Sequence, residues 1–353
     1  MIIIPLFLKR KMEQSMVYIM KLEAVHKQEV DQFRFLERWY SHDNDKVTIG
    51  IANISAHVPD IDANKEKILS AIKLFKEKQV NMILFPEFCL GGYFWEDELE
   101  CWKYMDQVVL DNHITWIKEF IEPEFDDTLQ YVVLNNIRKN VNKDKKYLNT
   151  TFVIQPGFDI SNFDLTYNKT FIPGIENTYT VSGVDDRLTL ETQWGRFGFC
   201  TCYDFCFPRL LLGCALIDEP DAIITISSWR GSGERNYPMM NVKNDHYYGY
   251  LWDILMPAMA AVNQSWMISC NAVGTHSISK AQFWGGSGIW APSGLQMIQG
   301  SHKQDELIVV HNIDLMGERQ FEKNDFDYSD DFKKLYKIIE NKRAFTSWIP
   351  EKL

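Results

Sequence analysis

The sequence predicts an α/β sandwich, and three patterns along the chain carry this prediction. A strand-like run at 47–54 is followed by an amphipathic helix at 61–78 and a short apolar strand at 82–85, which together form a βαβ unit. Two further apolar runs, at 131–135 and 149–155, flank a turn rich in lysine and asparagine and predict a hairpin. Strands and helices continue to alternate beyond it, as expected for sheets that are covered by helices.

The remaining elements follow from the same periodicities. Four more strands are predicted from short apolar runs, at 196–201, 222–227, 266–271 and 306–313, of which the last is the final strand. Helices are predicted at about 21–39, 114–121 and 332–343, from about Pro208 onward, and at 245–263 with a kink at Pro257. A glycine-rich hairpin is expected at 283–294.

A single main domain is favoured over two, because the chain contains no internal repeat at solenoid spacing and no linker rich in proline or serine. Residues 1–45 are predicted to form an N-terminal appendage with a helix that covers a surface or an oligomer contact. Residues 46–316 are predicted to form the main domain, and residues 317–353 a C-terminal tail with a helix.

The composition favours an acidic enzyme over a nucleic-acid-binding protein, since a formal net charge of −11 opposes phosphate contacts. The seven cysteines are irregularly spaced, which argues against a disulfide framework and against a zinc site. We therefore expect the cytoplasm and no metal. The apolar residues 1–8 precede Lys9, which reverses the charge order of a secretory signal, and no run reaches the ~18 apolar residues of a membrane helix.

Three separate motifs place reactive side chains directly after predicted strands. Glu87 ends the sequence Phe-Pro-Glu, Lys169 follows Tyr-Asn, and Cys202 begins the sequence Cys-Tyr-Asp-Phe-Cys-Phe-Pro. A thiol at a strand-to-helix junction is well placed to act as a thiolate, because helix amides favour the anion. The backbone N–H of Tyr203 would then help to bind an oxyanion.

The carboxylates and the amine complete this set. Burial beside the apolar strand would raise the pKa of Glu87 toward the range that a general base needs. Lys169 would stabilise a developing oxyanion by its charge. Glu176 would orient Lys169 or join the acid–base network. These groups are the ingredients of nucleophilic acyl chemistry.

Other chemistries have less support in the sequence. Six cysteines are interpreted as small buried hydrophobic residues: Cys89, Cys101, Cys200, Cys206, Cys214 and Cys270. There is no GxSxG motif, and none of the eight histidines adjoins a nucleophile motif. The glycines at 285, 286 and 288 form neither a dinucleotide-binding turn nor a phosphate-binding loop, so a nucleotide role is not expected.

Taken together and in this order, the motifs resemble those of the nitrilase superfamily, the carbon–nitrogen hydrolases. The resemblance runs from about Val47 to about Leu315 and includes Phe-Pro-Glu87, the Lys169 segment and Cys202-Tyr-Asp. It also includes the Asn-Ala-Val-Gly sequence at 271–274 and the glycine- and proline-rich sequence at 286–294.

The resemblance implies an αββα sandwich that dimerises into a four-layer αββααββα body. It implies a Glu-Lys-Cys triad in which Glu87 is the general base and acid, Lys169 stabilises the tetrahedral intermediate, and Cys202 forms an acyl-thioester. Glu176 matches the second glutamate of the family, whose role is in positioning. No cofactor is implied.

The chain also departs from the family pattern. Arg209 stands after Phe-Pro where many members carry glutamate, and the helix that usually ends Arg-Ala-x-Glu-Asn reads Met-Ala-Ala-Val-Asn at 259–263. Because both the arginine and the glutamate are absent, neither charge is left buried without its partner. The segment 230–250 resembles an insertion.

These residues favour hydrolysis of a small non-peptide amide or carbamoyl compound by a homo-oligomeric enzyme. Cys-Tyr-Asp is similar to the amidase and carbamoylase branches, whereas the short spacing of Lys169 and Glu176 is similar to that of nitrilases. A nitrilase, an acyltransferase with an amine acceptor and a non-catalytic scaffold remain alternatives. Three aromatic residues lie near the motifs: Tyr93, Phe94 and Trp229. They are expected either to line a substrate pocket or to pack in the core.

Overall fold

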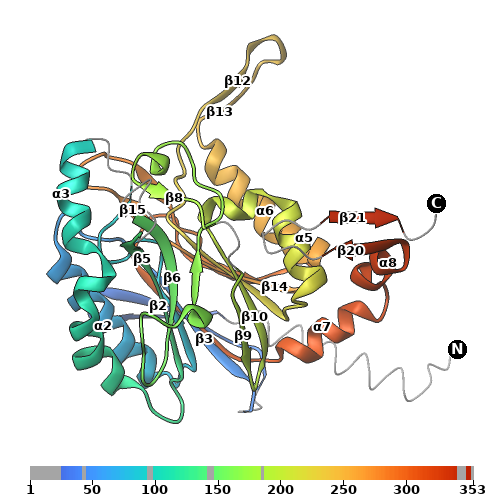
Figure 1. The fold of residues 1–353 in the computed structure, drawn as a ribbon, viewed down its shortest axis with the longest axis horizontal. Helices are drawn as coiled ribbons and strands as arrows, with labels where there is room; N and C mark the ends of the chain where they lie inside the picture. The colour runs from blue at the N-terminus through green and yellow to red at the C-terminus, as the bar shows by residue number, and fades with distance from the viewer. Residues whose placement is uncertain are drawn as a thin grey trace, which may run out of the picture.

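Two mixed β-sheets pack face to face between layers of helices in the computed structural model of the protein (Figure 1). The structure describes residues 25–41, 45–93, 98–140, 147–183, 187–339 and 347–350. This arrangement confirms the predicted α/β sandwich. The domain boundaries stay a prediction.

The first sheet contains nine strands, and its centre is parallel. Strands β3, β4 and β5 run parallel to one another, and β19 pairs antiparallel with β3. In spatial order, the sheet consists of β1 (His26–Val30), β2 (Phe33–Trp39), β19 (Glu306–Ile313), β3 (Val47–Asn53), β4 (Met82–Leu84), β5 (Tyr131–Lys139), β6 (Tyr147–Ile154) and β7 (Thr166–Asn168), with β8 (Thr180–Val181) beside β6.

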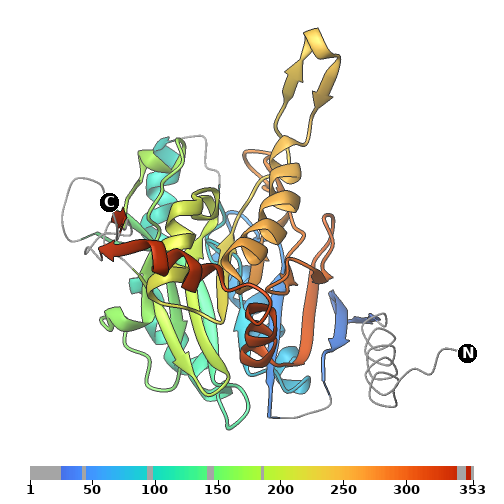
Figure 2. The ribbon, with the colours of Figure 1, turned by 90° about the vertical axis from the view of Figure 1, so that its right-hand side faces the viewer.

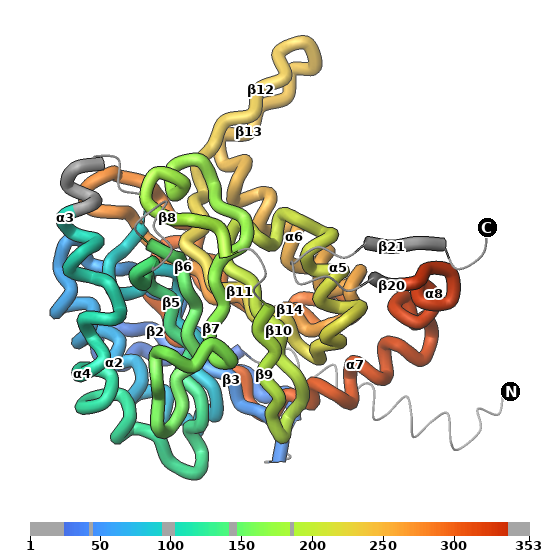
Figure 3. The backbone as a smooth tube through the Cα atoms, in the orientation of Figure 1, coloured from blue at the N-terminus to red at the C-terminus, as the bar shows by residue number. Residues whose placement is uncertain are grey.

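The second sheet has six strands and again a parallel centre, which Figure 3 shows where β10, β11 and β14 lie side by side. Its outer strands pair antiparallel. In spatial order, the sheet consists of β18 (Gln296–Gln299), β17 (Gly288–Trp290), β14 (Trp266–Asn271), β11 (Ala222–Ser227), β10 (Gly195–Thr201) and β9 (Thr189–Thr192).

The inner faces of the two sheets form the main hydrophobic core. Ile51 and Leu84 of the first sheet share one buried cluster with Phe197, Ile224 and Ile268 of the second. Such strands are apolar on both faces because each sheet is covered on both sides. The core therefore fixes the position of the loops that follow strands of both sheets.

Helices cover the outer faces, as Figure 1 shows. Helix α2 (Ile61–Glu77) buries the predicted stripe of Ile68, Ile72 and Phe75 on the first sheet. Its N-terminus is capped by Asp60, whose carboxylate accepts from the N–H of Ala63 at 3.0 Å. On the second sheet lie α5 (Pro208–Ile217), which starts at the predicted proline, and α6 (Tyr247–Asn263), which contains Pro257.

The smaller elements complete the chain. The helices are α3 (Glu98–Val108), α4 (Ile114–Trp116), α7 (Leu315–Lys323) and α8 (Tyr328–Leu335). The short helical turns are η1 (Leu110–His113), η2 (Ile117–Ile121), η3 (Glu122–Glu124), η4 (Phe163–Leu165), η5 (Glu176–Thr178), η6 (Cys202–Cys206) and η7 (Pro238–Met240). The short strands are β12 (Arg235–Tyr237), β13 (Val242–Asn244), β15 (Val273–Thr275), β16 (Gln282–Trp284), β20 (Tyr336–Ile339) and β21 (Ser347–Pro350). No helix in the described ranges is long and apolar enough to cross a bilayer.

The helix predicted at 21–39 is wrong. Residues 21–24 lie outside the described residues, and the rest forms the antiparallel hairpin of β1 and β2, with Asp31 in the left-handed region at its turn. Phe33 and Phe35 pack with α2, whereas Leu36 joins the core between the sheets. The apolar residues thus face both sides of a strand that pairs in parallel with β19.

The C-terminal prediction also needs correction. Helix α8 ends at Leu335 and is followed by β20, which pairs with β21. The strand at 306–313 is therefore not the last strand. The helix predicted at 332–343 does not extend through residues 336–339. Residues 340–343 lie outside the described residues. Tyr-Lys-Ile-Ile at 336–339 is rich in the aromatic and β-branched residues that strands favour.

The segment 230–250 contains a hairpin, β12 and β13, that projects from the body in both ribbon views (Figures 1 and 2). Its tip is apolar and exposed, and Met239 is 99% accessible. The base of this hairpin joins the start of α6.

Candidate active site

Glu87, Lys169 and Cys202 come together at the junction of the two sheets. Glu87 and Lys169 follow β4 and β7 of the first sheet, and Cys202 follows β10 of the second. All three side chains are buried. The three motifs that the sequence singled out therefore meet at one place.

Lys169 forms ion pairs with two carboxylates. Its Nζ lies 2.9 Å from Glu87 Oε1 and 2.5 Å from Glu176 Oε2. Burial by itself would lower the pKa of Lys169, but the charges of Glu176 and Glu87 outweigh it and hold this pKa well above its ordinary value. The lysine is thus a fixed positive charge in the site.

The Glu87 carboxylate is held by three donors. Besides Lys169, the Asn149 side-chain amide donates to Oε1 at 2.7 Å, and the Ser228 N–H donates to Oε2 at 2.8 Å. Burial raises the pKa of Glu87, and the charge of Lys169 opposes that rise. The raised pKa has the direction that was expected for a general base.

Cys202 occupies a sharp turn between β10 and η6, and its φ of 49° lies in the left-handed region. A capping box holds this turn, in which Thr201 and Asp204 each accept from the backbone N–H of the other. Asp204 also accepts from Tyr167 Oη at 2.8 Å and from the Phe171 N–H at 2.7 Å. A strained backbone that is held by its surroundings is typical of functional positions.

The surroundings of Cys202 favour the protonated thiol over the thiolate. Burial and the charge of the nearby Glu87 carboxylate raise the pKa of Cys202 well above its ordinary value, and Lys169 only partly opposes this. The expected lowering at the strand-to-helix junction does not occur, because desolvation outweighs it. A nucleophilic Cys202 would need a base, and Glu87 is the carboxylate whose charge raises the pKa of Cys202 most.

Glu176 lies behind Lys169 and is satisfied by several donors. Asn149 Nδ2 donates to its Oε1 at 2.7 Å, and Tyr93 Oη donates to its Oε2 at 2.5 Å. The Lys169 ammonium also lies 5.5 Å from the centre of the Tyr93 ring. Tyr93 is therefore tied to the charged cluster.

A pocket of about 590 Å³ opens over Cys202. Tyr93, Tyr203 and Trp229 line it. The substrate-pocket role expected for Tyr93 and Trp229 stays a prediction. Phe94 lies outside the described residues. The other lining residues are Ile172, Pro173, Gly174, Ile175, Cys206, Ser228, Arg230, Arg235, Tyr247, Tyr248 and Leu251.

Sequence reasoning missed Asn149 and Ser228. Asn149 is a fully buried amide in strand β6, next to the buried Thr150 and Thr151, and this group of polar residues within a strand is the signal that could have identified it. Ser228 holds Glu87 through its N–H and also through its hydroxyl, which donates to the Glu87 carbonyl at 2.7 Å, but a single serine after a strand is no distinctive signal in the sequence.

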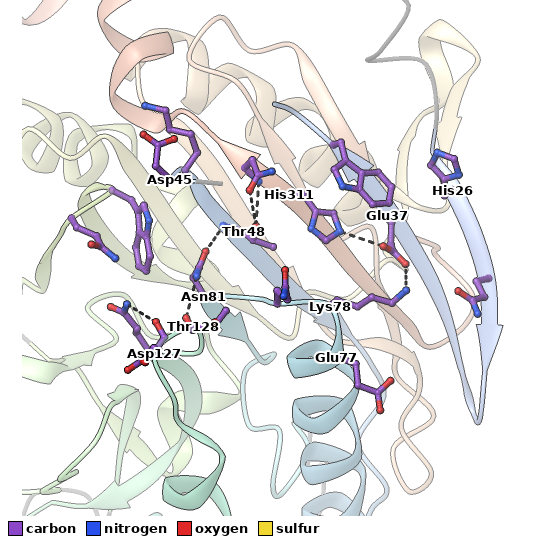
Figure 4. A pocket seen from close by; sticks show the side chains of 18 residues that line it. His26, Glu37, Asp45, Thr48, Glu77, Lys78, Asn81, Asp127, Thr128 and His311 are labelled. Carbon is purple, nitrogen blue, oxygen red and sulfur yellow. Dashed lines mark hydrogen bonds and ion pairs between the residues drawn. The ribbon is translucent and has the colours of Figure 1, made fainter. Parts of the chain in front are cut away.

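A second hollow, of about 940 Å³, lies around β2, β19 and the end of α2 (Figure 4). Figure 4 shows Glu37 between Lys78 and His311, with which it is paired at 2.5 and 3.2 Å. None of its described lining residues belongs to the Glu87–Lys169–Cys202 cluster. Its size does not make it the reactive site, because Glu37 is already engaged by Lys78 and His311 and no cysteine is among its described lining residues.

Within the described ranges, no group of three or more His, Cys, Asp or Glu residues is arranged to hold a metal ion. The fold and this cluster define an α/β sandwich protein with a buried cysteine beside a lysine and two carboxylates. Residues 47–323 match the profile of the family described as "Carbon-nitrogen hydrolase", and the chain belongs to this family.

Sequence relatives are distant. The chain is 23% identical over 307 residues to the Schizosaccharomyces pombe protein "Probable nitrilase C965.09", a match that covers 83% of this chain and 98% of the relative. A glutamine-dependent NAD(+) synthetase of Aquifex aeolicus is 39% identical over 70 residues, which are 18% of this chain and 12% of that protein.

Solved structures share the fold. A carbon–nitrogen hydrolase from Helicobacter pylori aligns with a TM-score of 0.66 at 18% identity, covering 82% of this chain and 95% of that chain. An amidase from Nesterenkonia aligns with a TM-score of 0.62 at 18% identity, covering 82% and 94%. A variant of that amidase has been solved in complex with acrylamide.

Proposed function

We propose that the protein hydrolyses a small non-peptide amide or carbamoyl compound through an acyl-thioester on Cys202. The observation that carries this proposal is that Cys202, Glu87 and Lys169 are buried together, with Glu87 Oε1 2.9 Å from Lys169 Nζ. A protonated thiol, a base and a fixed positive charge are the minimum that acyl transfer to sulfur requires.

In the first half-reaction, Glu87 accepts the thiol proton as Sγ attacks the carbonyl carbon. Lys169 and the Tyr203 N–H stabilise the oxyanion of the tetrahedral intermediate. Glu87 then donates its proton to the leaving nitrogen, the C–N bond breaks, and ammonia or an amine departs. The acyl group remains bound to sulfur.

In the second half-reaction, Glu87 accepts a proton from water as the water oxygen attacks the thioester carbon. The C–S bond breaks, the Cys202 sulfur regains a proton, and a carboxylic acid is released. Glu176 supports both steps by holding Lys169 at 2.5 Å. No cofactor takes part in this proposal.

Amide hydrolysis has the better support among the candidate reactions, because the Nesterenkonia relative is an amidase and its variant binds acrylamide. The name of the S. pombe relative supports the alternative of a nitrilase, which converts a nitrile to acid and ammonia. An acyltransferase would use the same thioester with an amine acceptor. A scaffold without activity would need none of the buried charges.

Intact-mass spectrometry with a mixed panel of amides, carbamoyl compounds and nitriles tests this proposal. An adduct on the wild type that is absent from Cys202→Ala is expected, together with release of ammonia or amine. Near-native turnover by Cys202→Ala would overturn the mechanism. Acid and ammonia from nitriles alone would favour the nitrilase, and transfer to an added amine in preference to water would favour the acyltransferase.

The assembly and location are also proposals. The family resemblance implies a homodimer with a four-layer αββααββα body, which light scattering on the purified protein would test. A cytoplasmic location is consistent with the free thiols of the six described cysteines. Fractionation of the source cells would test it.

A further inference from the structure

The side chain of Asp204 touches both of the segments that carry the amine and the thiol. Its Oδ1 accepts from the Phe171 N–H at 2.7 Å, and its Oδ2 accepts from Tyr167 Oη at 2.8 Å and from the Thr201 N–H at 3.0 Å. Asp204 is fully buried. One carboxylate therefore joins a loop of the first sheet to a turn of the second.

The donors to this carboxylate flank the two reactive residues in the chain. Tyr167 and Phe171 lie two positions before and two positions after Lys169. Thr201 directly precedes Cys202, whose backbone is in the left-handed region. Any movement of the carboxylate would therefore reach the amine and the thiol through a very short stretch of backbone.

Glu87, the third reactive group, is tied to the second sheet by other contacts. Its N–H donates to the Ser227 carbonyl at 3.2 Å, and its Oε2 accepts from the Ser228 N–H at 2.8 Å. The backbone of Lys169 is instead held within the first sheet, where its N–H donates to the Asn149 carbonyl at 2.9 Å. The carboxylate of Asp204 adds a link from the Lys169 loop to the second sheet.

Both oxygens of Asp204 have to accept hydrogen bonds. Burial raises the pKa of Asp204 to about 6, against the Phe171 hydrogen bond and the Lys169 charge, so the charged form prevails at neutral pH. An asparagine of the same size accepts on one side and donates from the other. Its amide N–H groups would face the Phe171 N–H in one orientation and the Thr201 N–H in the other. Either orientation breaks the link at one end.

We propose that Asp204 is a positioning residue, which holds the Lys169 loop against the Cys202 turn so that the ammonium reaches the oxygen of the carbonyl group that the sulfur attacks. This inference rests on the proposed function. A charge stabilises an oxyanion only at close range, and a misplacement of about 1 Å can lower a rate about 100-fold. Asp204 touches no substrate and acts through the backbone on either side of it.

Asp204→Asn and Asp221→Asn form a matched pair for the kinetics of ammonia release from propionamide. Asp221 likewise accepts from a backbone N–H, that of Arg196 at 2.9 Å, and from the Arg319 side chain at 3.3 Å. It directly precedes β11, whose far end carries Ser227 at the site.

In Asp204→Asn, kcat should fall about 100-fold while KM changes by less than about threefold, because the groups that react are misplaced and the pocket is kept. Asp221→Asn should lower the melting temperature and keep kcat. Equal kcat values for the two variants, measured well below both melting temperatures, would overturn the positioning role.

Tyr167→Phe keeps this test decisive if Asp204→Asn does not fold. It removes the hydroxyl donor and leaves the two backbone donors to Asp204 in place. The expected fall in kcat is about 10-fold, as for the loss of a hydrogen bond to a charged group. Wild-type kcat in Tyr167→Phe would then overturn the positioning role.

Alkylation of Cys202 by iodoacetamide tests the positioning without turnover, because this displacement uses the thiolate and forms no oxyanion. Burial, Glu87 and Glu176 raise the pKa of the thiol, and Lys169 lowers it. If Asp204 keeps Lys169 near the thiol, Asp204→Asn weakens this lowering. The alkylation rate at pH 8, followed by mass spectrometry of the Cys202 peptide, should then fall about threefold or more. Removal of the Asp204 charge alone would raise the rate.

The two measurements separate this proposal from the proposed function. Slower alkylation in Asp204→Asn, with the wild-type rate in Asp221→Asn, supports the positioning role even if the wild type hydrolyses no amide, a result that would sink only the proposed function. Unchanged or faster alkylation in Asp204→Asn overturns the positioning role and leaves amide hydrolysis standing.

Discussion

The ammonium of Lys169 lies 2.9 Å from the Glu87 carboxylate, although 82 positions separate the two residues in the chain. Neither side chain exposes any surface. Each charge is tolerated in the interior only because the other is present. The cluster is therefore as important to the folded state as to the proposed chemistry.

Lys169→Met should remove both activity and stability. It leaves Glu87 and Glu176 buried without a cation, and breaking such a pair costs about 3–5 kcal/mol of unfolding free energy. Turnover should fall more than ~100-fold, which corresponds to at least ~2.7 kcal/mol of barrier. Urea denaturation and an ammonia assay measure the two effects.

The matched control for this substitution is Lys334→Met, whose ion pairs with Asp330 and Asp331 are exposed. Exposed pairs contribute little to stability, so the denaturation midpoint should not change. Equal losses of stability in the two variants would contradict the role assigned to the buried cluster.

Tyr93→Phe should weaken the support of Glu176 while keeping the aromatic wall of the pocket. The hydroxyl that donates to Glu176 Oε2 at 2.5 Å is lost, and a hydrogen bond to a charged group contributes about 1.5–3 kcal/mol. We expect kcat to fall more than KM changes. Tyr237→Phe on the exposed hairpin is the control. If Tyr93→Phe raises only KM, then Tyr93 acts through binding alone.

The pH dependence of kcat/KM should reflect Glu87. Glu87 must be charged to accept the thiol proton, and burial raises its pKa, so activity is lost as pH falls through a value above the ordinary ~4.3 of glutamate. The raised pKa of Cys202 keeps the thiol protonated at neutral pH. An acid limb at or below ~4 in a pH–rate profile would argue against Glu87 as the base.

Glu37→Gln should lower stability without affecting the reaction. Glu37 accepts from Lys78 at 2.5 Å and from His311 at 3.2 Å, and its loss should cost about 1–3 kcal/mol at neutral pH. The His311 hydrogen bond and the Lys78 charge lower the pKa of Glu37 against the effect of burial. This stabilisation is therefore present above the ordinary carboxyl pKa and is lost as pH falls through the lowered value.

Denaturation of wild type and Glu37→Gln at a series of pH values checks this sign. The two unfolding free energies should converge in acid, where the native carboxylate is protonated. A difference that grows as pH falls would contradict the prediction.

The sequence predicted the central elements because their signals are local. The stripe of Ile68, Ile72 and Phe75 has helical spacing and packs on one face, as the structure shows. The β1–β2 hairpin was missed because Val30, Phe33 and Leu36 also fit a helix. Their preference for a strand depends on β19, which comes from the far end of the chain.

Part of the candidate site could likewise be predicted from local sequence, and part depends on contacts between distant segments. Glu87, Lys169 and Cys202 could be singled out because each follows an apolar run in a recognisable motif. The bridge that Asn149 makes between Glu87 and Glu176 exists only after β6 is placed beside both loops. The direction of the Cys202 pKa likewise depends on burial by distant segments, which local sequence does not report.

The backbone conformation at Cys202 also limits which residues can replace cysteine during evolution. At a φ of 49°, a side chain without a branch at Cβ is accommodated, whereas a β-branched side chain is a severe outlier. Serine can therefore replace cysteine without moving the backbone, but threonine cannot. A lineage that exchanged the sulfur nucleophile for an oxygen would have to pass through serine.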